Sequence, residues 1–255
     1  ELLCNSIASI SYEKFGIVRE KTPFVVSTQP DSFVLDFARS VSLQKRAPCV
    51  LVGSKYRASI LNRSTEEYSF RLETPSRLIP KVTLALLGDH QVDNAVTAWC
   101  VLDQLLPEFD PAKVTDVWAN LTLPGRFEFR VKEGREVILD AAHTINSAKG
   151  LRKTLDQLYG GEPITFVLSF LDDKNVEGFV QHLVRWGDAV VLTQVDNPRA
   201  LPARVIEARF HTVWPADRIT TAITNNVRVA WQKACKLAGR GPICVSGSFK
   251  LIEGM

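Results

Sequence analysis

Short apolar runs alternate with amphipathic stretches along the first half of the chain. Runs of four to eight apolar residues between turn residues are typical of buried strands, and apolar residues three and four apart are typical of helices. The pattern predicts strands at Pro23–Ser27, Cys49–Ser54, Tyr68–Glu73 and Val82–Gly88. It predicts helices at Asp31–Leu43, Gln91–Leu106 and Pro111–Asn120, the last with proline at its start.

A turn signal at Pro124–Gly125 separates this half from a second one in which the pattern restarts. FEFRV and EVILD are expected to pair around the turn EGR, followed by strands in ITFVLSF, AVVLTQ and PICVSGS. Helices are predicted from the spacing of apolar residues at Ser147–Tyr159, Val176–Trp186, Pro202–Phe210 and Asn225–Ala238. Strand–helix alternation of this kind predicts an α/β fold with a mostly parallel sheet and helices on both faces. We place the domain boundary near Pro124, giving domains 1–123 and 124–255.

Composition excludes some classes of protein. Hydrophobic residues make up 45% and charged residues 23% of the 255 residues, as in ordinary globular proteins. The net charge is only +3, and no basic block is interleaved with aromatic residues, so a nucleic-acid partner is not expected. No apolar run approaches the length of a membrane span, so membrane insertion is not expected either. The scattered cysteines, Cys4, Cys49, Cys100, Cys235 and Cys244, favour reduced thiols in an intracellular protein over disulfides or a zinc site.

The ends of the predicted strands are where chemistry is expected, since open parallel sheets bind ligands beyond the carboxyl ends of their strands. EVILD ends in Asp140, and His143 follows. A carboxylate there can accept hydrogen bonds from ribose hydroxyls, and a histidine can bond a nucleotide or a substrate. The alternative is that Asp140 caps the next helix.

Further polar clusters follow other predicted strands. Asp172, Asp173 and Lys174 follow ITFVLSF, Asp196 and Arg199 follow AVVLTQ, and Ser246-Gly247-Ser248 follow PICV. Each cluster alone is compatible with ordinary loop chemistry. Their coincidence at one predicted sheet edge strengthens the case for a site.

Two further segments carry candidate binding residues. Arg126 lies between the two halves, and its guanidinium fork suits phosphate, although a surface salt bridge is the alternative. His90 to Asn94 open a helix, and an Asn or Gln amide there can read an adenine edge. The alternative for this segment is a polar first turn capped by Asp89.

Several common catalytic motifs are absent. The sequence contains no GxxxxGK[ST] phosphate loop, no GxSxG elbow and no cluster of His and Cys with metal-ligand spacing. However, GDHQVDNAVTA, LPGRFEF, VILDAAHTINSAKGL, LDDK, DNPRALPARVI and VSGSFKLI occur in one order, preceded by SIASISYEKFGIV. This order resembles the folylpolyglutamate synthase and dihydrofolate synthase family of Mur-type ligases.

The resemblance implies a fold and a reaction. Residues 1–123 would be the C-terminal part of a central P-loop-type ATPase domain, and residues 124–255 a Rossmann-like C-terminal domain. ATP would phosphorylate a carboxylate of folate or dihydropteroate, and the amino group of L-glutamate would attack the acyl phosphate. Mg²⁺ is the expected cofactor with ATP, and a monovalent cation such as K⁺ is a further candidate.

The same resemblance assigns roles to five residues. Asn94 matches an asparagine near the adenine, Arg126 a hinge arginine that reaches the ATP phosphates, and Asp140 an aspartate that binds nucleotide and orients the hinge. His143 matches a histidine close to the reaction centre, and Lys14 a lysine that is carbamylated and serves as a carboxylate near the metal.

Two departures bear on these roles. The family's DGAHN reads DAAHT here, with Ala141 and Thr144 in place of Gly and Asn. The family's phosphate loop and metal-binding glutamate would lie before Glu1, so this chain alone is expected to be inactive. The alternatives are a truncated, non-catalytic relative that binds nucleotide or a full-length partner, and a Mur-type ligase with another acceptor. A monomer in the cytoplasm is expected, with the mitochondrion and the plastid as other locations.

Overall fold

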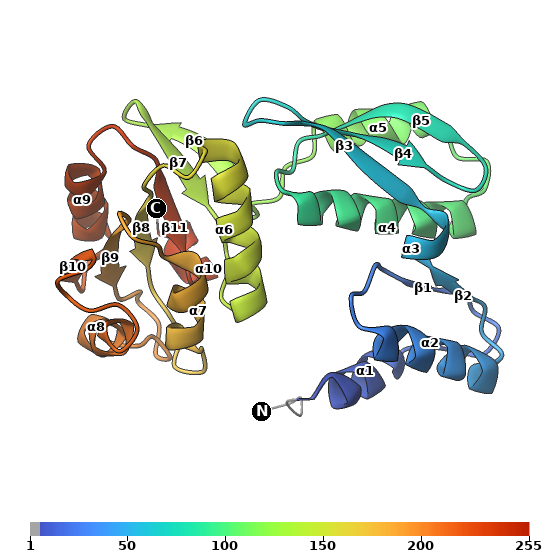
Figure 1. Cartoon of the computed structure of the whole chain (residues 1–255), viewed down its shortest axis with the longest axis horizontal. Coiled ribbons are helices and arrows are strands. Elements are labelled where there is room, and N and C mark those ends of the chain that lie inside the picture. The colour runs from blue at the N-terminus through green and yellow to red at the C-terminus, as the bar shows by residue number, and fades with distance from the viewer. Residues whose placement is uncertain (1–5, 255) are drawn as a thin grey trace. The chain divides into compact units, whose positions relative to one another are not determined.

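The computed structural model describes residues 6–254 and divides the chain into two compact units (Figure 1). Within that part, the first unit comprises residues 6–62, 69–84 and 89–120, and the second comprises residues 63–68, 85–88 and 121–254. No helix formed by the described residues is long and apolar enough to cross a membrane. The cysteines in this part, Cys49, Cys100, Cys235 and Cys244, are free thiols, and Cys4 lies outside it.

The first unit begins with two helices and a small parallel sheet. Helix α1 (Ile7–Phe15) packs on helix α2 (Ser32–Lys45). Strands β1 (Phe24–Val26) and β2 (Cys49–Leu51) pair in parallel. The side chain of Asp31 accepts a hydrogen bond from the first turn of α2 and fixes where that helix begins.

A small apolar core joins these elements. Val18, Val41 and Ala47 are buried and pack against three phenylalanine rings, those of Phe15, Phe24 and Phe37. The predicted strand at Cys49–Ser54 is only partly correct, because α3 (Val52–Lys55) forms a helical turn after β2.

The rest of the first unit is a three-stranded sheet and two helices. The strand order is β3 (Arg57–Arg63), β4 (Tyr68–Glu73) and β5 (Leu78–Leu84). Helices α4 (Asp89–Leu105) and α5 (Pro111–Ala119) follow, and α5 packs against β5. The predictions for β4 and the two helices are confirmed.

The sequence pattern missed β3 and misplaced β5. Six of the seven β3 residues are exposed and only Ile60 is half-buried, so no apolar alternation marks that strand. The predicted strand at Val82–Gly88 begins four residues late, because the first half of β5 is mostly exposed, and it ends four residues late, because Leu86 and Leu87 are buried in the loop that follows.

The second unit is built around a six-stranded sheet with the order β10-β9-β8-β11-β7-β6. All neighbours pair in parallel except β6 and β7, which form an antiparallel hairpin. The strands are β6 (Glu128–Lys132), β7 (Arg135–Leu139), β8 (Thr165–Leu168), β9 (Ala189–Thr193), β10 (Thr220–Thr224) and β11 (Ile243–Ser246). The predicted α/β class and mostly parallel sheet are confirmed.

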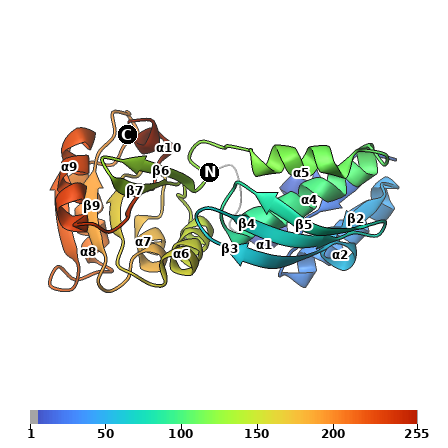
Figure 2. The same ribbon diagram turned by 90° about the horizontal axis from the view of Figure 1, so that it is seen from above.

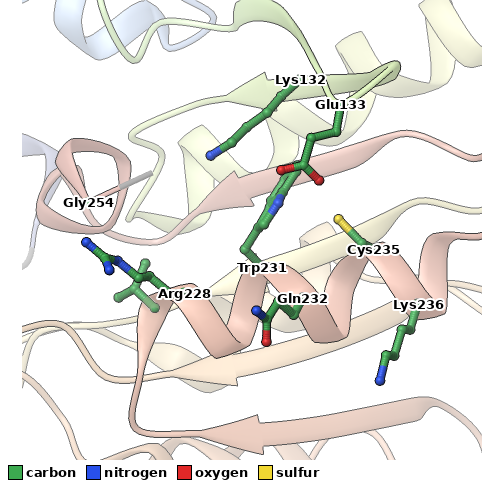
Figure 3. Close-up of a pocket in the computed structure, with 9 residues that line it drawn as sticks. Lys132, Glu133, Arg228, Trp231, Gln232, Cys235, Lys236 and Gly254 are labelled. Carbon is green, nitrogen blue, oxygen red and sulfur yellow. The ribbon is translucent and has the colours of Figure 1, made fainter.

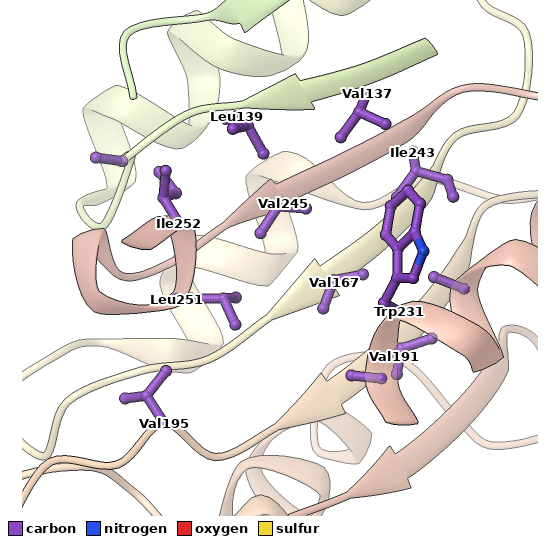
Figure 4. Packing of buried hydrophobic residues seen from close by; sticks show 13 residues of the cluster. Val137, Leu139, Val167, Val191, Val195, Trp231, Ile243, Val245, Leu251 and Ile252 are labelled. Carbon is purple, nitrogen blue, oxygen red and sulfur yellow. The ribbon is translucent and has the colours of Figure 1, made fainter. Parts of the chain in front are cut away.

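Helices cover both faces of this sheet (Figure 2). They are α6 (Ile145–Tyr159), α7 (Val176–Leu183), α8 (Ala203–His211), α9 (Val227–Ala238) and α10 (Phe249–Glu253). Alternate strand residues such as Val167, Val191 and Val245 pack against Trp231 of α9 and Leu251 of α10 (Figure 4). The intervening strand residues point to the other face, because successive side chains of a strand alternate. Helices α6, α7 and α8 form a packed row there.

Candidate functional site

The carboxyl ends of the parallel strands meet at one edge of the second unit's sheet. Asp140 directly follows β7, Ser169 follows β8, and Gly247 follows β11, the strand between them in the sheet. The N–H of Asp140 donates to the carbonyl of Val245, which ties the end of β7 to the end of β11. The predicted gathering of polar residues at this edge follows from the topology.

The carboxylate of Asp140 accepts backbone hydrogen bonds from a residue before it in the chain and from a residue after it. Its Oδ2 accepts a hydrogen bond from the N–H of Phe127 at 2.9 Å, and its Oδ1 accepts one from the N–H of Ala142 at 2.8 Å. Hydrogen bonds to a charged acceptor are stronger than neutral ones. Asp140 therefore fastens residues 124–127, the PGRF loop, to the carboxyl edge of the sheet.

The PGRF loop is held at further points. The N–H of Gly125 donates to Oε2 of Glu128 at 2.9 Å, and its carbonyl accepts from the N–H of Ala141 at 2.8 Å. Gly125 has φ +69°, which glycine adopts at little cost, and Phe127 is buried with φ +48°. Arg126 lies between these two fixed residues with its side chain exposed, and it forms no ion pair within residues 6–254.

The alternative role for Asp140, capping the next helix, is wrong. Helix α6 begins at Ile145 and is capped by Thr144, whose Oγ1 accepts from the N–H of Ser147. The Ser147 hydroxyl lies within hydrogen-bond reach of the N–H of Thr144, which completes a capping box. Thr144 is thus the residue that caps α6.

His143 lies between Asp140 and that cap, with an exposed side chain. Its Nδ1 is 2.8 Å from the carbonyl oxygen of Ala141. A carbonyl can only accept, so Nδ1 carries the proton in this arrangement. In the neutral ring Nε2 is then left as an acceptor.

Gly247 directly follows β11 and lies against the backbone at the end of β8. Its N–H donates to the carbonyl of Ala142 at 2.9 Å, and a Cβ built on it would lie 2.5 Å from the carbonyl oxygen of Ser169. Its φ of +93° also disfavours any side chain. The backbone of the site therefore requires glycine here.

Replacing Gly247 with alanine is expected to destabilise the second unit by on the order of 2–3 kcal/mol, from backbone strain and the carbonyl clash. Urea unfolding measures the loss. Gly134→Ala is the matched control, since Gly134 has φ +72° but nothing within 4 Å of a built Cβ. Equal losses in the two variants would show that the contact with Ser169 carries no cost.

The other strand-end clusters form ion pairs with one another. Arg199 Nη2 lies 2.9 Å from Asp173 and its Nε 3.4 Å from Asp172, so the loops after β8 and β9 are joined. Lys174 contacts Asp173 at 2.7 Å, and this hydrogen bond lowers the pKa of the Asp173 carboxyl. Asp196 is exposed nearby in sequence.

Sequence reasoning did not single out two hydroxyls at the same edge. The Oγ of Ser169 and the Oγ1 of Thr193, at the ends of β8 and β9, are buried and have no hydrogen-bond partner within residues 6–254. Buried polar groups normally have partners. Sequence reasoning also did not single out Glu128, which directly follows the PGRF loop and accepts a hydrogen bond from the N–H of Gly125.

The remaining candidates belong to the first unit. Asn94, on α4, is exposed, and its Nδ2 donates to Oε1 of Gln91 at 3.1 Å. Asp89 is the first residue of helix α4. Lys14 is an exposed residue in the last turn of α1. Among residues 6–254 no group of three or more His, Cys, Asp and Glu side chains is placed to hold a metal ion.

Sequence comparison finds known proteins that are similar to this chain. The family model described as "Dihydrofolate synthetase, C-terminal domain" matches residues 126–255. The chain is 29% identical over 212 residues to dihydrofolate synthetase of Saccharomyces cerevisiae, covering 78% of this chain and 47% of the relative. It is 28% identical over 242 residues to dihydrofolate synthase/folylpolyglutamate synthase of Mycobacterium tuberculosis, covering 91% of this chain and 49% of the relative.

Structure comparison agrees. The crystal structure of Mycobacterium tuberculosis folylpolyglutamate synthase complexed with ADP and AMPPCP superposes with a TM-score of 0.86 at 27% identity. That match covers 99% of this chain and 59% of the other. The chain thus spans about half the length of the curated relatives it matches.

Proposed function

The chain belongs to the dihydrofolate synthetase family, and from that premise we propose that it is part of an ATP-dependent ligase that adds glutamate to a folate-type acceptor. Two relatives that it matches over most of its length are named dihydrofolate synthetase and dihydrofolate synthase/folylpolyglutamate synthase. The Mycobacterium tuberculosis structure in this group was solved with ADP and AMPPCP. ATP is therefore the proposed energy source.

The proposed reaction has two steps. A carboxylate oxygen of the acceptor attacks the γ-phosphorus of ATP, the bond to the β,γ-bridging oxygen breaks, and ADP leaves. The amino group of glutamate then attacks the carbonyl carbon of the acyl phosphate. Inorganic phosphate leaves, the nitrogen loses a proton, and an amide remains. Both steps build up negative charge on phosphoryl oxygens, which fixed cations stabilise.

The observation that carries this proposal is the fastening of the PGRF loop by Asp140. The loop presents Arg126, an exposed guanidinium without an acidic partner within residues 6–254, between two backbone positions that are held by carboxylates. A cation on a fixed backbone stabilises transferring phosphoryl groups more than one on a flexible loop, because less reorganisation is needed. Asp140 acts in this scheme as a positioning residue.

Asn94, His143 and Lys14 are the other proposed site residues. The amide oxygen of Asn94 is available to accept a hydrogen bond from the adenine amino group, and Nε2 of His143 is available to a substrate near the reaction centre. When bound, Mg²⁺ would neutralise charge on the phosphates. The described residues do not form a metal site by themselves, and Lys14 would contribute to one only as a carbamate.

A ligase assay on the full-length gene product tests the proposal. Labelled glutamate and ATP are supplied with dihydropteroate, tetrahydrofolate or a cell-wall peptide precursor as acceptor. We expect acceptor-dependent ADP release and a labelled amide with at least one of the two pterin acceptors. Turnover of the cell-wall acceptor alone would assign another ligase of the same superfamily, and no turnover of any acceptor would overturn the proposal.

Asp140→Asn in the same protein is expected to lower ADP release about tenfold. The amide would turn an NH₂ group toward one of the two N–H donors, and leaving a partly buried donor without an acceptor costs about 1–3 kcal/mol. Asp217→Asn, at an exposed aspartate beside Arg218, serves as the matched control. Unchanged turnover in Asp140→Asn, with a native circular dichroism spectrum, would contradict the positioning role.

A further inference from the structure

Helix α10 packs directly against the PGRF loop. A Cβ built on Gly125 would lie 3.2 Å from Cδ1 of Ile252 and 3.3 Å from Cε2 of Phe249. Phe249 and Ile252 are three residues apart on α10, so they lie on one face of the helix. The backbone of Gly125 therefore rests against both side chains. Glycine is needed at position 125 for this close approach as well as for its φ of +69°.

This apolar contact supplies a precision that the hydrogen bonds of the loop do not. The N–H groups of Gly125 and Phe127 donate to the side-chain carboxylates of Glu128 and Asp140. Such bonds tolerate N···O distances from about 2.7 to 3.2 Å and a range of angles, so they allow a sideways shift of the loop. Close-packed side chains allow much less, because protein interiors are packed as densely as crystals. The contact with α10 therefore limits where the PGRF loop can lie.

Helix α10 in turn depends on tertiary contacts for its own position. Its five residues are too few to form a stable helix by themselves. Leu251 is fully buried in the apolar cluster on this face of the sheet (Figure 4). Beyond the helix, Gly254 lines an open hollow of about 820 Å³ along α9 (Figure 3). The helix is thus fixed to the core through Leu251, and Phe249 and Ile252 pass that position on to the loop.

Phe249 and Ile252 differ in what else they do. Ile252 is only 8% exposed and belongs to the core cluster, so its packing also serves the stability of the second unit. Phe249 is 49% exposed and is not a member of that cluster. A half-exposed ring contributes little to a core. Its contact with Gly125 is therefore the feature of Phe249 that bears on the site.

We propose that Phe249 is a positioning residue, whose ring holds the PGRF loop and with it Arg126 in place for phosphoryl transfer. This role rests on the proposed function, because it acts through the contact of Arg126 with the phosphates. Asp140 and Glu128 orient the N–H groups of the loop, and the ring of Phe249 sets the distance of the loop from α10. A displacement of a catalytic group by about 1 Å can cost roughly a hundredfold in rate. Loss of the ring should therefore slow the reaction without removing any group that touches ATP.

Acceptor-dependent ADP release by the full-length protein tests the role. We expect Phe249→Ala to lower kcat about tenfold with the KM for ATP unchanged, and Phe249→Leu, which keeps an apolar side chain against Gly125, to recover most of the rate. In an Arg126→Ala background Phe249→Ala should cause no further loss, since the ring acts through that arginine. Phe33→Ala is the matched control, at a phenylalanine of α2 that is 46% exposed and stacks on Phe37. Additive losses in the double variant, or equal rates in Phe249→Ala and Phe33→Ala, would overturn the proposal.

Hydrogen–deuterium exchange of the same proteins tests the contact without ligase activity. The peptide spanning residues 122–128 should exchange at least fivefold faster in Phe249→Ala, because the N–H groups of Gly125 and Phe127 would be held less firmly. The peptide that contains β8 should be unchanged, which excludes general destabilisation. Unchanged exchange of residues 122–128 would overturn the role of Phe249 alone. Absence of ADP release from the native protein would instead overturn the proposed function, so the two failures are distinguishable.

Discussion

Arg126→Ala in the full-length protein is expected to lower acceptor-dependent ADP release at least about a hundredfold, the usual cost of removing a fixed group that stabilises charge in a transition state. The expectation follows from the PGRF loop. Its neighbours Gly125 and Phe127 are held by carboxylates, so the guanidinium is presented from an ordered backbone. The loss should appear in turnover with little change in stability, because the side chain is exposed.

Two variants sharpen this experiment. Arg126→Lys keeps the charge but loses the planar fork of donors, and we expect it to recover only part of the rate. Arg240→Ala removes an exposed arginine that precedes β11 at the amino edge of the sheet, and its turnover should match the native protein. If Arg126→Ala turned over as fast as Arg240→Ala, the arginine would have no role in phosphoryl transfer.

Arg152→Met is expected to destabilise the second unit by about 3–5 kcal/mol, the typical cost of removing one partner of a buried ion pair. Arg152 of α6 donates to Asp188 Oδ2 at 2.9 Å, and both side chains are almost fully buried. The same carboxylate accepts hydrogen bonds from the N–H groups of Ile164 and Arg185. Without the Arg152 guanidinium, Asp188 would be a buried charge with backbone N–H hydrogen bonds and only the more distant attraction of Arg185.

The pKa shifts of Asp188 and Arg152 reflect two opposing effects, burial and the attraction between the two charges. Burial raises the pKa of the Asp188 carboxyl and lowers the pKa of the Arg152 guanidinium, and their mutual attraction opposes both shifts. Denaturant unfolding followed by circular dichroism measures the loss. Arg209→Met is the matched control, because its ion pair with Glu177 at 2.7 Å is about one-third exposed on each side. We expect that variant to lose less than about 1 kcal/mol, and equal losses in both variants would contradict the buried-pair argument.

Elements buried on two faces were predictable from sequence. Strands β8 and β11 read as short continuous apolar runs because every residue in them is buried. Edge strand β10, TTAIT, was missed because most of its residues are only half-buried and polar threonines dominate it. Helix α10 was missed because five residues are too few to show a helical period.

The position of Asp140 at a strand end was predictable from sequence, but its hydrogen bonds were not. The end of β7 was expected to carry chemistry, and Asp140 lies there. Its partner, the N–H of Phe127, is thirteen residues upstream and faces it only because Phe127 adopts a positive φ that no sequence rule requires. Similarly, Arg152 and Asp188 are 36 residues apart, and neither segment alone marks a buried ion pair.

The antiparallel pairing of β6 has a mechanical consequence. In this hairpin Glu128 lies opposite Leu139, and Lys132 lies opposite Arg135 beside the turn. Tension applied to the chain ahead of the PGRF loop would therefore peel an edge strand from its open end, one residue pair after another. Unzipping of this kind offers little resistance at each step. The force that β6 withstands should then be set by the two hydrogen bonds that precede the strand pairing, from the N–H of Phe127 to Asp140 and from the N–H of Ala141 to the carbonyl of Gly125.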